Sequence, residues 1–252
     1  MIRSGNAAQI GLREVIVRRL TDVAPLGPAT IQLLQSLEGV RTARPRTELM
    51  AELQISPPAQ FLVCGWAARM RNLPDGRRQI LEFLLPGDAI GLSFCEHPRA
   101  LGSTSALTLV KTLDAAPVRA AMMSADPRWR DLRDALHGAA CLHEGFLLDQ
   151  VLRLGRLTAY ERMCHLLLEL RERLAAVGLA EGGTFTLNAT QEMLADATGL
   201  SLVHVNRVLQ QMRRDHLLDL HGGAAQFLDL ERAAAVCGYV TAPRAPLPNL
   251  AP

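Results

Sequence analysis

The sequence predicts an α+β protein, in which an antiparallel β domain is followed by one long helix and then by a smaller helical domain. Three observations support this prediction. Residues 40–118 consist of short apolar runs broken by turn residues, which is typical of antiparallel strands. The stretch after Pro127 carries apolar residues at helical spacing for much longer than an average helix. Residues 190–214 contain two short helical patterns on either side of a glycine.

Composition limits the class of protein. The chain has 252 residues, of which 49% are hydrophobic and 21% charged, and its net charge is +2. It can bury a real core and is too apolar to be mostly disordered. No apolar run reaches the roughly 18 residues of a membrane span, and the N-terminus lacks the apolar stretch of a secretory signal. We therefore expect a cytoplasmic protein that does not enter a membrane, with its five scattered cysteines reduced.

The first elements are predicted in chain order. Residues 1–40 show helical spacing around Pro25 and Pro28. The strand candidates that follow lie at 61–64, 66–72, 78–85 and 107–113. Asp75-Gly76 separates the second candidate from the third and is a strong hairpin signal, because both residues tolerate positive φ.

A long helix is predicted after Pro127. Its apolar stripe follows a three-four alternation, which can mean a helix lying on its own β domain or a helix pairing with its copy in a second subunit. We favour the second interpretation, a homodimer. The stripe comprises Trp129, Leu132, Leu136, Ala139, His143, Phe146, Leu147 and Val151.

Residues 190–214 predict a helix-turn-helix. The hydroxyls of Thr190 and Ser201 can cap the two helices, and Gly199 can adopt the positive φ of a sharp turn. A hairpin is predicted at 217–230. The buried stripe of the second helix is predicted to comprise Val205, Val208, Leu209 and Met212.

A second helix with this pattern fits the major groove of DNA. Arg207 can make two hydrogen bonds to guanine, and Asn206 can bind adenine or a phosphate. Ser201 and His204 lie where the free N–H groups of the helix start can hold a phosphate, and Leu202 and Val203 can contact thymine methyl groups. The DNA-contacting candidates are Thr190, Gln191, Ser201, Leu202, Val203, His204, Asn206, Arg207 and Arg213.

Catalysis is not expected. There is no Walker-type loop, no dinucleotide fingerprint after a strand and no H-E-x-x-H motif, since His143-Glu144 lacks a second histidine. Residues 156–221 contain seven arginines against eight Asp and Glu residues, a net charge of −1. Binding to DNA therefore needs local positive charge rather than a basic domain.

Three segments together resemble the Crp/Fnr superfamily of bacterial transcription regulators. They are Gly65 to Leu92, the long helix after Pro127, and the helix-turn-helix with its hairpin; the run from Gly199 to Arg207 is similar to alphaproteobacterial members. The resemblance implies a β-roll sensor domain of the cyclic-nucleotide-binding type over 1–125, a dimerisation helix over 126–155, a winged-helix DNA-binding domain over 156–240 and a disordered tail over 241–252. It also implies a homodimer that binds a palindromic promoter site through Ser201 to Arg214, with RNA polymerase as a partner.

The sensor segment departs from cyclic-nucleotide-binding members. Those carry Gly-Glu-Leu and Arg-Ser-Ala, whereas this chain has Gly91, Leu92 and Ser93 at the first motif and Thr104 and Ser105 at the second. A buried phosphate without its arginine would be an unpaired charge, so cyclic AMP is not expected. These five residues are kept as candidates for an effector pocket, and the effector is not identified.

Other cofactors of the family find little support. Iron–sulfur members use an N-terminal cysteine cluster, and the first cysteine here is Cys64. Cys95 and His97 lie near the haem-ligating region of other members, but their spacing from Gly87-Asp88 does not fit well. The main expectation is a buried Cys95 and a solvated His97, with haem, metal or thiol redox sensing as alternatives. An effector-binding sensor module is the alternative function.

Two departures concern the DNA-reading helices. Many members place a glutamate where this chain has Val203, and that glutamate accepts a hydrogen bond from cytosine N4. We expect the half-site to lose the cytosine preference and to keep a guanine under Arg207. Met193 replaces another common glutamate, which should remove the polar side of a capping box.

Overall fold

The computed structural model describes residues 10–240, so residues 1–9 and the tail predicted over 241–252 lie outside the described part. The chain begins with two short helices, α1 (Glu14–Thr21) and α2 (Pro28–Gln35). Helix α1 buries Val15, Ile16 and Leu20, and α2 begins at a proline, which suits the first helical position because its missing N–H has no partner there. The helical prediction for the N-terminal segment is confirmed for these two stretches.

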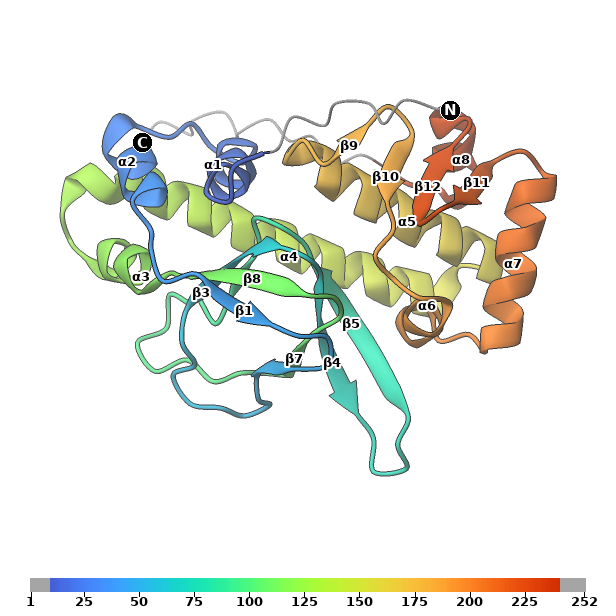
Figure 1. The fold of residues 1–252 in the computed structure, drawn as a ribbon, viewed down its shortest axis with the longest axis horizontal. Helices are drawn as coiled ribbons and strands as arrows, with labels where there is room; N and C mark the ends of the chain where they lie inside the picture. The colour runs from blue at the N-terminus through green and yellow to red at the C-terminus, as the bar shows by residue number, and fades with distance from the viewer. Residues whose placement is uncertain (1–9, 241–252) are drawn as a thin grey trace.

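Two four-stranded antiparallel sheets form the β domain beneath the long helix (Figure 1). One sheet has the order β1-β8-β3-β6 and the other β2-β7-β4-β5. Trp66 and Phe83 are buried and meet edge to face with ring centroids 5.9 Å apart. The strands are β1 (Arg41–Ala43), β2 (Glu48–Met50), β3 (Gln60–Cys64), β4 (Ala67–Asn72), β5 (Arg78–Leu84), β6 (Ala89–Ile90), β7 (Ser103–Ala106) and β8 (Val110–Asp114).

The first three strand predictions are confirmed as β3, β4 and β5, and the hairpin between β4 and β5 turns at Gly76 with φ of 87°. The prediction of a strand over 107–113 was wrong at its start. Leu107 and Thr108 both donate to the carbonyl of Trp66, which places them in the turn between β7 and β8. The short strands β1, β2, β6 and β7 were not predicted, since two to four residues carry too little alternation to detect.

Helices cover one face of the β domain and continue past it. They are α3 (Ala116–Met123), the 3₁₀ turn η1 (Pro127–Trp129), α4 (Arg130–Arg156) and α5 (Ala159–Ala176). Helix α4 has 27 residues and runs from beside the N-terminal helices to the C-terminal domain (Figure 1). A capping box formed by Thr158 and Glu161 starts α5 directly after α4 ends.

The C-terminal domain combines a four-stranded antiparallel sheet of order β11-β12-β10-β9 with three short helices. One of them, α8, was not predicted, although Asp229 caps it and Gly238 ends it with positive φ. The elements are β9 (Ala180–Glu181), β10 (Thr184–Thr186), α6 (Gln191–Thr198), α7 (Leu202–Arg214), β11 (Leu218–His221), β12 (Ala224–Phe227) and α8 (Leu230–Cys237).

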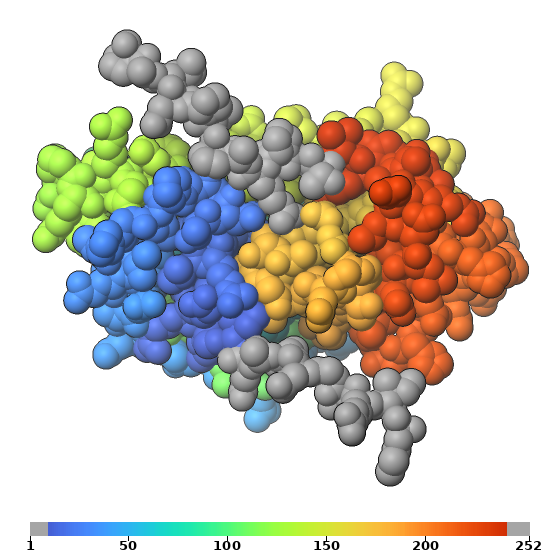
Figure 2. All heavy atoms as spheres, turned by 90° about the horizontal axis from the view of Figure 1, so that it is seen from above, coloured from blue at the N-terminus to red at the C-terminus, as the bar shows by residue number. Residues whose placement is uncertain are grey.

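The two halves of the chain pack directly on one another. Figure 2 shows the N-terminal helices, in blue, lying against the segment around β9 and β10, in gold. A Cβ atom on Gly178 would clash with the Arg18 guanidinium, so the backbone at Gly178 lies close to α1. Across residues 10–240, none of the helices combines the length and apolar character that crossing a bilayer requires.

Candidate nucleic-acid interface

Helices α6 and α7 form the helix-turn-helix that the sequence predicts. The Thr190 hydroxyl accepts from the N–H of Met193 at 3.2 Å, and the Ser201 hydroxyl accepts from the N–H of His204 at 3.3 Å. Gly199 ends α6 with φ of 66°, a left-handed conformation that a glycine adopts at little cost. The expectation that Met193 leaves the capping box incomplete needs correction, because its sulfur accepts from the N–H of Thr190 at 3.5 Å. A thioether is a weak acceptor, so this half of the box is weak.

Helix α7 separates its apolar and polar faces as predicted. Val205, Val208, Leu209 and Met212 are buried in the core of the C-terminal domain. Leu202 is 50% exposed and Val203 is 69% exposed, although both are apolar. No other part of residues 10–240 covers this apolar pair. Its exposure at the start of a capped helix therefore favours contact with another molecule.

The structure brings most of the predicted DNA-contacting residues to one exposed end of the molecule. Those on the surface are Thr190, Gln191, Ser201, Leu202, Val203, His204, Arg207 and Arg213. Asn206 is half-buried and donates its amide to the carbonyl of Leu202 at 3.2 Å, and Arg213 pairs with Asp219 at 3.6 Å. Asn206 and Arg213 thus each have an internal partner that DNA would have to replace, whereas the Arg207 side chain has no hydrogen-bond or ion-pair partner among residues 10–240.

Arg162 is a supporting residue that sequence reasoning missed. Its guanidinium donates to the carbonyl of Thr198 at the end of α6, at 2.6 Å, and to the carbonyls of Leu154 and Leu157 at the end of α4. Free carbonyls at helix ends need donors, and one arginine supplies them to two helices. Arg162 therefore fixes the turn around Gly199 against the end of α4. Its position one residue after the capping Glu161 gave no signal of this role.

The first part of the stripe predicted to face a second subunit packs instead on the protein's own N-terminal helices and β domain. Leu132 and Leu136 are buried in one cluster with Phe61 and Val118. The expectation that Leu136 lies at a dimer interface was therefore wrong, and the alternative of a helix on its own β domain describes this part of α4. Of the predicted stripe, Val151 is 69% exposed. The intermediate members are Trp129, Ala139, His143, Phe146 and Leu147.

A second seam of α4 is exposed. Cys141, Leu148, Val151 and Leu152 point away from the β domain, and Leu148 is 65% exposed. Leu148 lies seven residues after Cys141, and Val151 and Leu152 lie three and four residues after Leu148, which places them on one side of the helix. Exposed leucine and valine at this spacing on a long helix are suited to pairing with another helix. The register of this seam is shifted from the predicted stripe.

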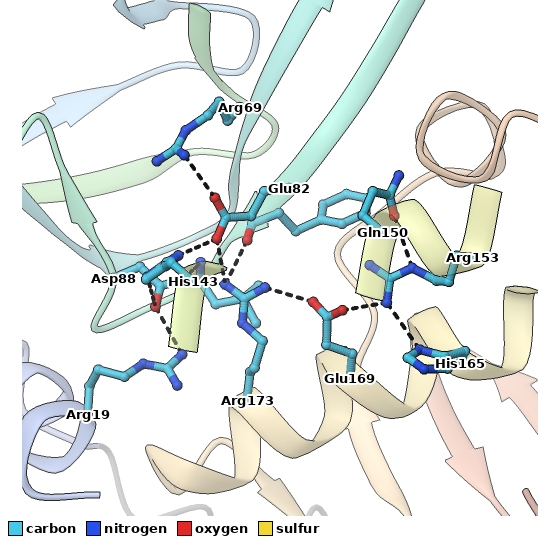
Figure 3. A network of polar contacts seen from close by, with 12 residues as sticks. Arg19, Arg69, Glu82, Asp88, His143, Gln150, Arg153, His165, Glu169 and Arg173 are labelled. Carbon is cyan, nitrogen blue, oxygen red and sulfur yellow. Dashed lines mark hydrogen bonds and ion pairs between the residues drawn. The ribbon is translucent and has the colours of Figure 1, made fainter. Parts of the chain in front are cut away.

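A network of buried charges joins the C-terminal domain to the β domain (Figure 3). Arg173 on α5 donates to Asp88 in the turn between β5 and β6 at 2.8 Å, and to Glu169 on its own helix at 3.0 Å. Arg19 of α1 also pairs with Asp88 at 3.0 Å. Glu82 of β5 is bonded to His143 of α4. Apart from the half-buried His143, these groups lie inside the protein, where removing one partner is far more costly than at the surface.

Charge pairing governs protonation in this network. Burial alone would raise the pKa of Asp88, but Arg19 and Arg173 outweigh it and hold the pKa at about 2. The pKa of Arg173 is raised, since its carboxylate partners outweigh burial. At the far end, burial and the neighbouring Arg153 lower the pKa of His165 to about 4. Asp88 and Arg173 are therefore charged, and His165 is neutral, at physiological pH.

A second set of contacts docks the helix-turn-helix on the β domain. Asp196 of α6 pairs with Arg78 of β5 at 2.7 Å. The carbonyl of Ala197 accepts from Gln150 of α4 at 2.6 Å and from Gln79 of β5 at 3.2 Å. The position of α6 is thus fixed by both the β domain and the long helix.

The predicted effector-pocket residues do not all meet at one cavity. A cavity of about 320 Å³ lies between α1, α4 and the turn after β5, and its wall includes Leu92 and Ser93 but not Gly91, Thr104 or Ser105. Phe94 stacks on His137 of α4 at its edge, with ring centroids 3.7 Å apart. Most of the wall is apolar.

Cys95 is exposed, so the expectation that it is buried was wrong; His97 is exposed as expected. Both lie on a surface loop. Among residues 10–240 there is no group of three or more potential metal-ligating side chains. The geometry therefore gives no support to a metal or haem site at this pair.

Comparison with known proteins supports a regulator of transcription. Residues 161–234 match the family model of the Crp-like helix-turn-helix domain. The chain is 28% identical to the transcriptional activatory protein AadR of Rhodopseudomonas palustris, over 87% of this chain and 90% of the relative. It is 30% identical to the nitrogen fixation regulation protein FixK of Bradyrhizobium diazoefficiens, over 65% of this chain and 67% of the relative.

The fold is also similar to solved structures. FixK2 from Bradyrhizobium japonicum superposes with a TM-score of 0.67 at 26% identity, covering 81% of this chain and 98% of that protein. The regulator TTHB099 from Thermus thermophilus superposes with a TM-score of 0.58 at 21% identity, covering 79% of this chain and 97% of that protein. At that identity the second likeness speaks for the fold alone.

Proposed function

Because this chain belongs to the Crp/Fnr family of bacterial transcription regulators, we propose that it binds a palindromic promoter site as a homodimer, with α7 in the major groove. Regulators of this family bind promoter DNA and dimerise. The observation that carries the proposal for this chain is the outer face of α7. It presents Leu202, Val203, His204 and Arg207 to solvent from a helix whose opposite side is buried in the domain core.

Base reading is assigned to the outer face of α7. Arg207 lies in the second turn of the helix, where a long guanidinium can donate two hydrogen bonds to guanine O6 and N7. Leu202 and Val203 offer apolar contact to thymine methyl groups. Val203 has no acceptor for cytosine N4, so the half-site has no cytosine preference at that position. Asn206 can contact a base or a phosphate only if its amide gives up the hydrogen bond to the Leu202 carbonyl.

Phosphate binding is assigned to the helix starts and to the side of α7. The N-termini of α6 and α7 carry free N–H groups that attract phosphate, next to Thr190, Gln191, Ser201 and His204. Arg213 lies in the last turn of α7, where it pairs with Asp219. These groups hold the helix in register on the duplex and carry little sequence information.

Dimerisation is assigned to the exposed seam of α4 rather than to its buried stripe. Leu148, Val151 and Leu152 are large apolar side chains left in solvent by a single chain. Pairing α4 with its copy would bury them and would relate the two α7 helices by a two-fold axis. Half-sites one helical turn apart, about 10 base pairs, would then be read together.

Each role is assigned to one part of the chain. We assign residues 1–125 to a sensor domain, 126–155 to the dimerisation helix and 156–240 to the DNA-binding domain. The chain's similarity to the transcriptional activatory protein AadR and to the transcriptional activator protein FnrL of Cereibacter sphaeroides supports contact with RNA polymerase in the cytoplasm. Gly91, Thr104 and Ser105 stay predictions for an effector, and Leu92 and Ser93 line the cavity that an effector could enter.

Selection from a random duplex library tests this proposal. The purified protein should enrich a sequence with two inverted half-sites, and light scattering of the complex should give two chains per duplex. An enriched sequence without two-fold symmetry, or one chain per duplex, would refute the homodimeric mode. A lack of any enrichment at low salt would refute sequence-specific binding.

A further inference from the structure

Two buried thiols meet inside the C-terminal domain. Cys164 on α5 donates to the carbonyl of Ala233 at 3.4 Å, and Cys237 at the end of α8 donates to the same oxygen at 3.2 Å. Cys237 reaches this carbonyl along its own helix, whereas Cys164 reaches it from α5. The shared carbonyl oxygen places the two sulfur atoms beside one another. Residues far apart in the sequence are thus joined at one point between α5 and α8.

The surroundings of Cys164 and Cys237 favour a reaction between the two thiols over the binding of a metal. Cys164 has no exposed surface and Cys237 is 4% exposed, and both lie in the main core cluster of the C-terminal domain. In the described part of the chain, no third potential metal-ligating side chain joins them to make a metal site. The DNA-reading face of α7 does not involve either residue.

We propose that Cys164 and Cys237 are a redox pair, which a hydroperoxide converts into an intramolecular disulfide linking α5 to α8. This goes beyond the assignment of DNA binding, since it concerns a site on the other side of the domain core. Disulfides formed in a reducing compartment are usually transient and redox-sensing, so a dithiol that is reduced at rest fits such a site.

The reaction proceeds in two balanced steps. The thiolate of Cys237 attacks one oxygen of the hydroperoxide; an S–O bond forms, the O–O bond breaks, and the other oxygen leaves as water or an alcohol after taking up a proton. Cys164 sulfur then attacks the Cys237 sulfenic acid; the S–S bond forms, the S–O bond breaks, and hydroxide leaves with the Cys164 proton as water. The two sulfurs lose two electrons in total, and the hydroperoxide gains them.

The two cysteines are not equivalent. The neighbouring Cys164 thiol lowers the pKa of Cys237, whereas the Cys237 thiol together with burial raises the pKa of Cys164. Cys237 is also the more exposed of the two and lies at the end of its helix, before Gly238. Attack therefore begins at Cys237, and Cys164 resolves the sulfenic acid.

A disulfide here would enclose the whole helix-turn-helix and the hairpin in one covalent loop. Helix α8 is already tied to the end of α7, because Arg232 donates to the carbonyl of Asp215 at 2.9 Å. Cross-linking so long a segment lowers the entropy of the unfolded domain. Oxidation should therefore raise the midpoint of thermal unfolding by about 5 °C or more.

The test uses the full chain with the exposed cysteines removed, as Cys64→Ser, Cys95→Ser and Cys141→Ser. Folded protein is treated with stoichiometric hydrogen peroxide, and intact mass, free thiols and non-reduced peptides are measured. The proposal predicts a loss of about two hydrogens in mass, a single cross-linked peptide pair joining Cys164 to Cys237, and a higher unfolding midpoint that dithiothreitol reverses.

Two further variants separate the roles. In the same background, Cys164→Ala should leave Cys237 as a sulfenic acid that dimedone traps, whereas Cys237→Ala should leave Cys164 unmodified. Circular dichroism shows whether each variant is folded. The proposal is overturned if both thiols stay reduced in the folded parent protein and cross-link only in urea, or if dimedone labels Cys164 instead.

Discussion

Arg173 of α5 donates to Asp88 in the β5–β6 turn across 2.8 Å, and both side chains are buried. This pair joins the DNA-binding half of the chain to the β domain at a turn that also forms part of the wall of the 320 Å³ cavity. The turn cannot move without moving or breaking this contact. The network in Figure 3 is thus a direct physical connection between the two halves of the protein.

Replacing Asp88 with asparagine should therefore destabilise the protein strongly. It leaves Arg19 and Arg173 buried beside a neutral amide, and removing one partner of a buried pair costs about 3–5 kcal/mol. Urea unfolding measures the change. Arg77→Gln is the control, because its pair with Asp75 is exposed and should contribute nothing measurable. Equal effects of the two substitutions would show that the Asp88 pair does not stabilise the fold.

Stability should also depend on pH through His165. Its folded pKa of about 4 lies below the ordinary histidine pKa of about 6.5, so between these values the unfolded chain binds a proton that the folded chain does not. The free energy of unfolding therefore falls as the pH decreases through this range, by up to about 3 kcal/mol. His165→Asn should remove this part of the decrease, which urea titrations at pH 7 and pH 4.5 measure. A difference between wild type and variant that is the same at both pH values would contradict the assignment.

The two seams of α4 should respond differently to substitution. Leu148→Glu with Val151→Glu should give a folded monomer, because both side chains are exposed in a single chain. Leu136→Ala should instead lower the free energy of unfolding by about 2–5 kcal/mol, since it opens a cavity in the core of its own protomer. Light scattering and urea unfolding distinguish these outcomes. A double variant that stays dimeric would place the interface elsewhere.

Much of the DNA-binding domain could be predicted from sequence, because its signals are local. Thr190, Gly199 and Ser201 each mark a cap or a turn within a few residues of the helix that they define. The hairpin at Gly76 is local in the same sense. The β-hairpin after α7 was also predicted, since Gly222-Gly223 separates two short apolar runs.

The direction that α4 faces could not be predicted. A three-four alternation identifies a helical face but not the surface that covers it, and α4 carries two such faces. The buried network could not be predicted from sequence either, because Arg173 and Asp88 are separated by 85 residues. Arg162 and the thiol pair depend on the same kind of long-range contact.

We expect the half-site to lack a cytosine preference because Val203 stands where other members carry a glutamate. Val203→Glu adds an acceptor on the exposed face of α7, next to the position where cytosine N4 would lie. We expect sites selected by this variant to gain one C·G pair in each half-site, at a cost to wild-type sites of about 1–3 kcal/mol. Competition binding with the two consensus duplexes measures the preference. Identical preferences would show that residue 203 does not face a base.

The base-reading role of Arg207 is tested most directly by comparing sites selected by wild type, Arg207→Ala and the distant control Arg77→Ala. The account predicts that Arg207→Ala loses the preference for guanine at one symmetric position in each half-site and weakens binding by about 1–3 kcal/mol. Arg77→Ala should keep the wild-type sequence and affinity. A variant lacking the Arg207 guanidinium that selects the same sequence as wild type would contradict the claim that α7 reads the DNA.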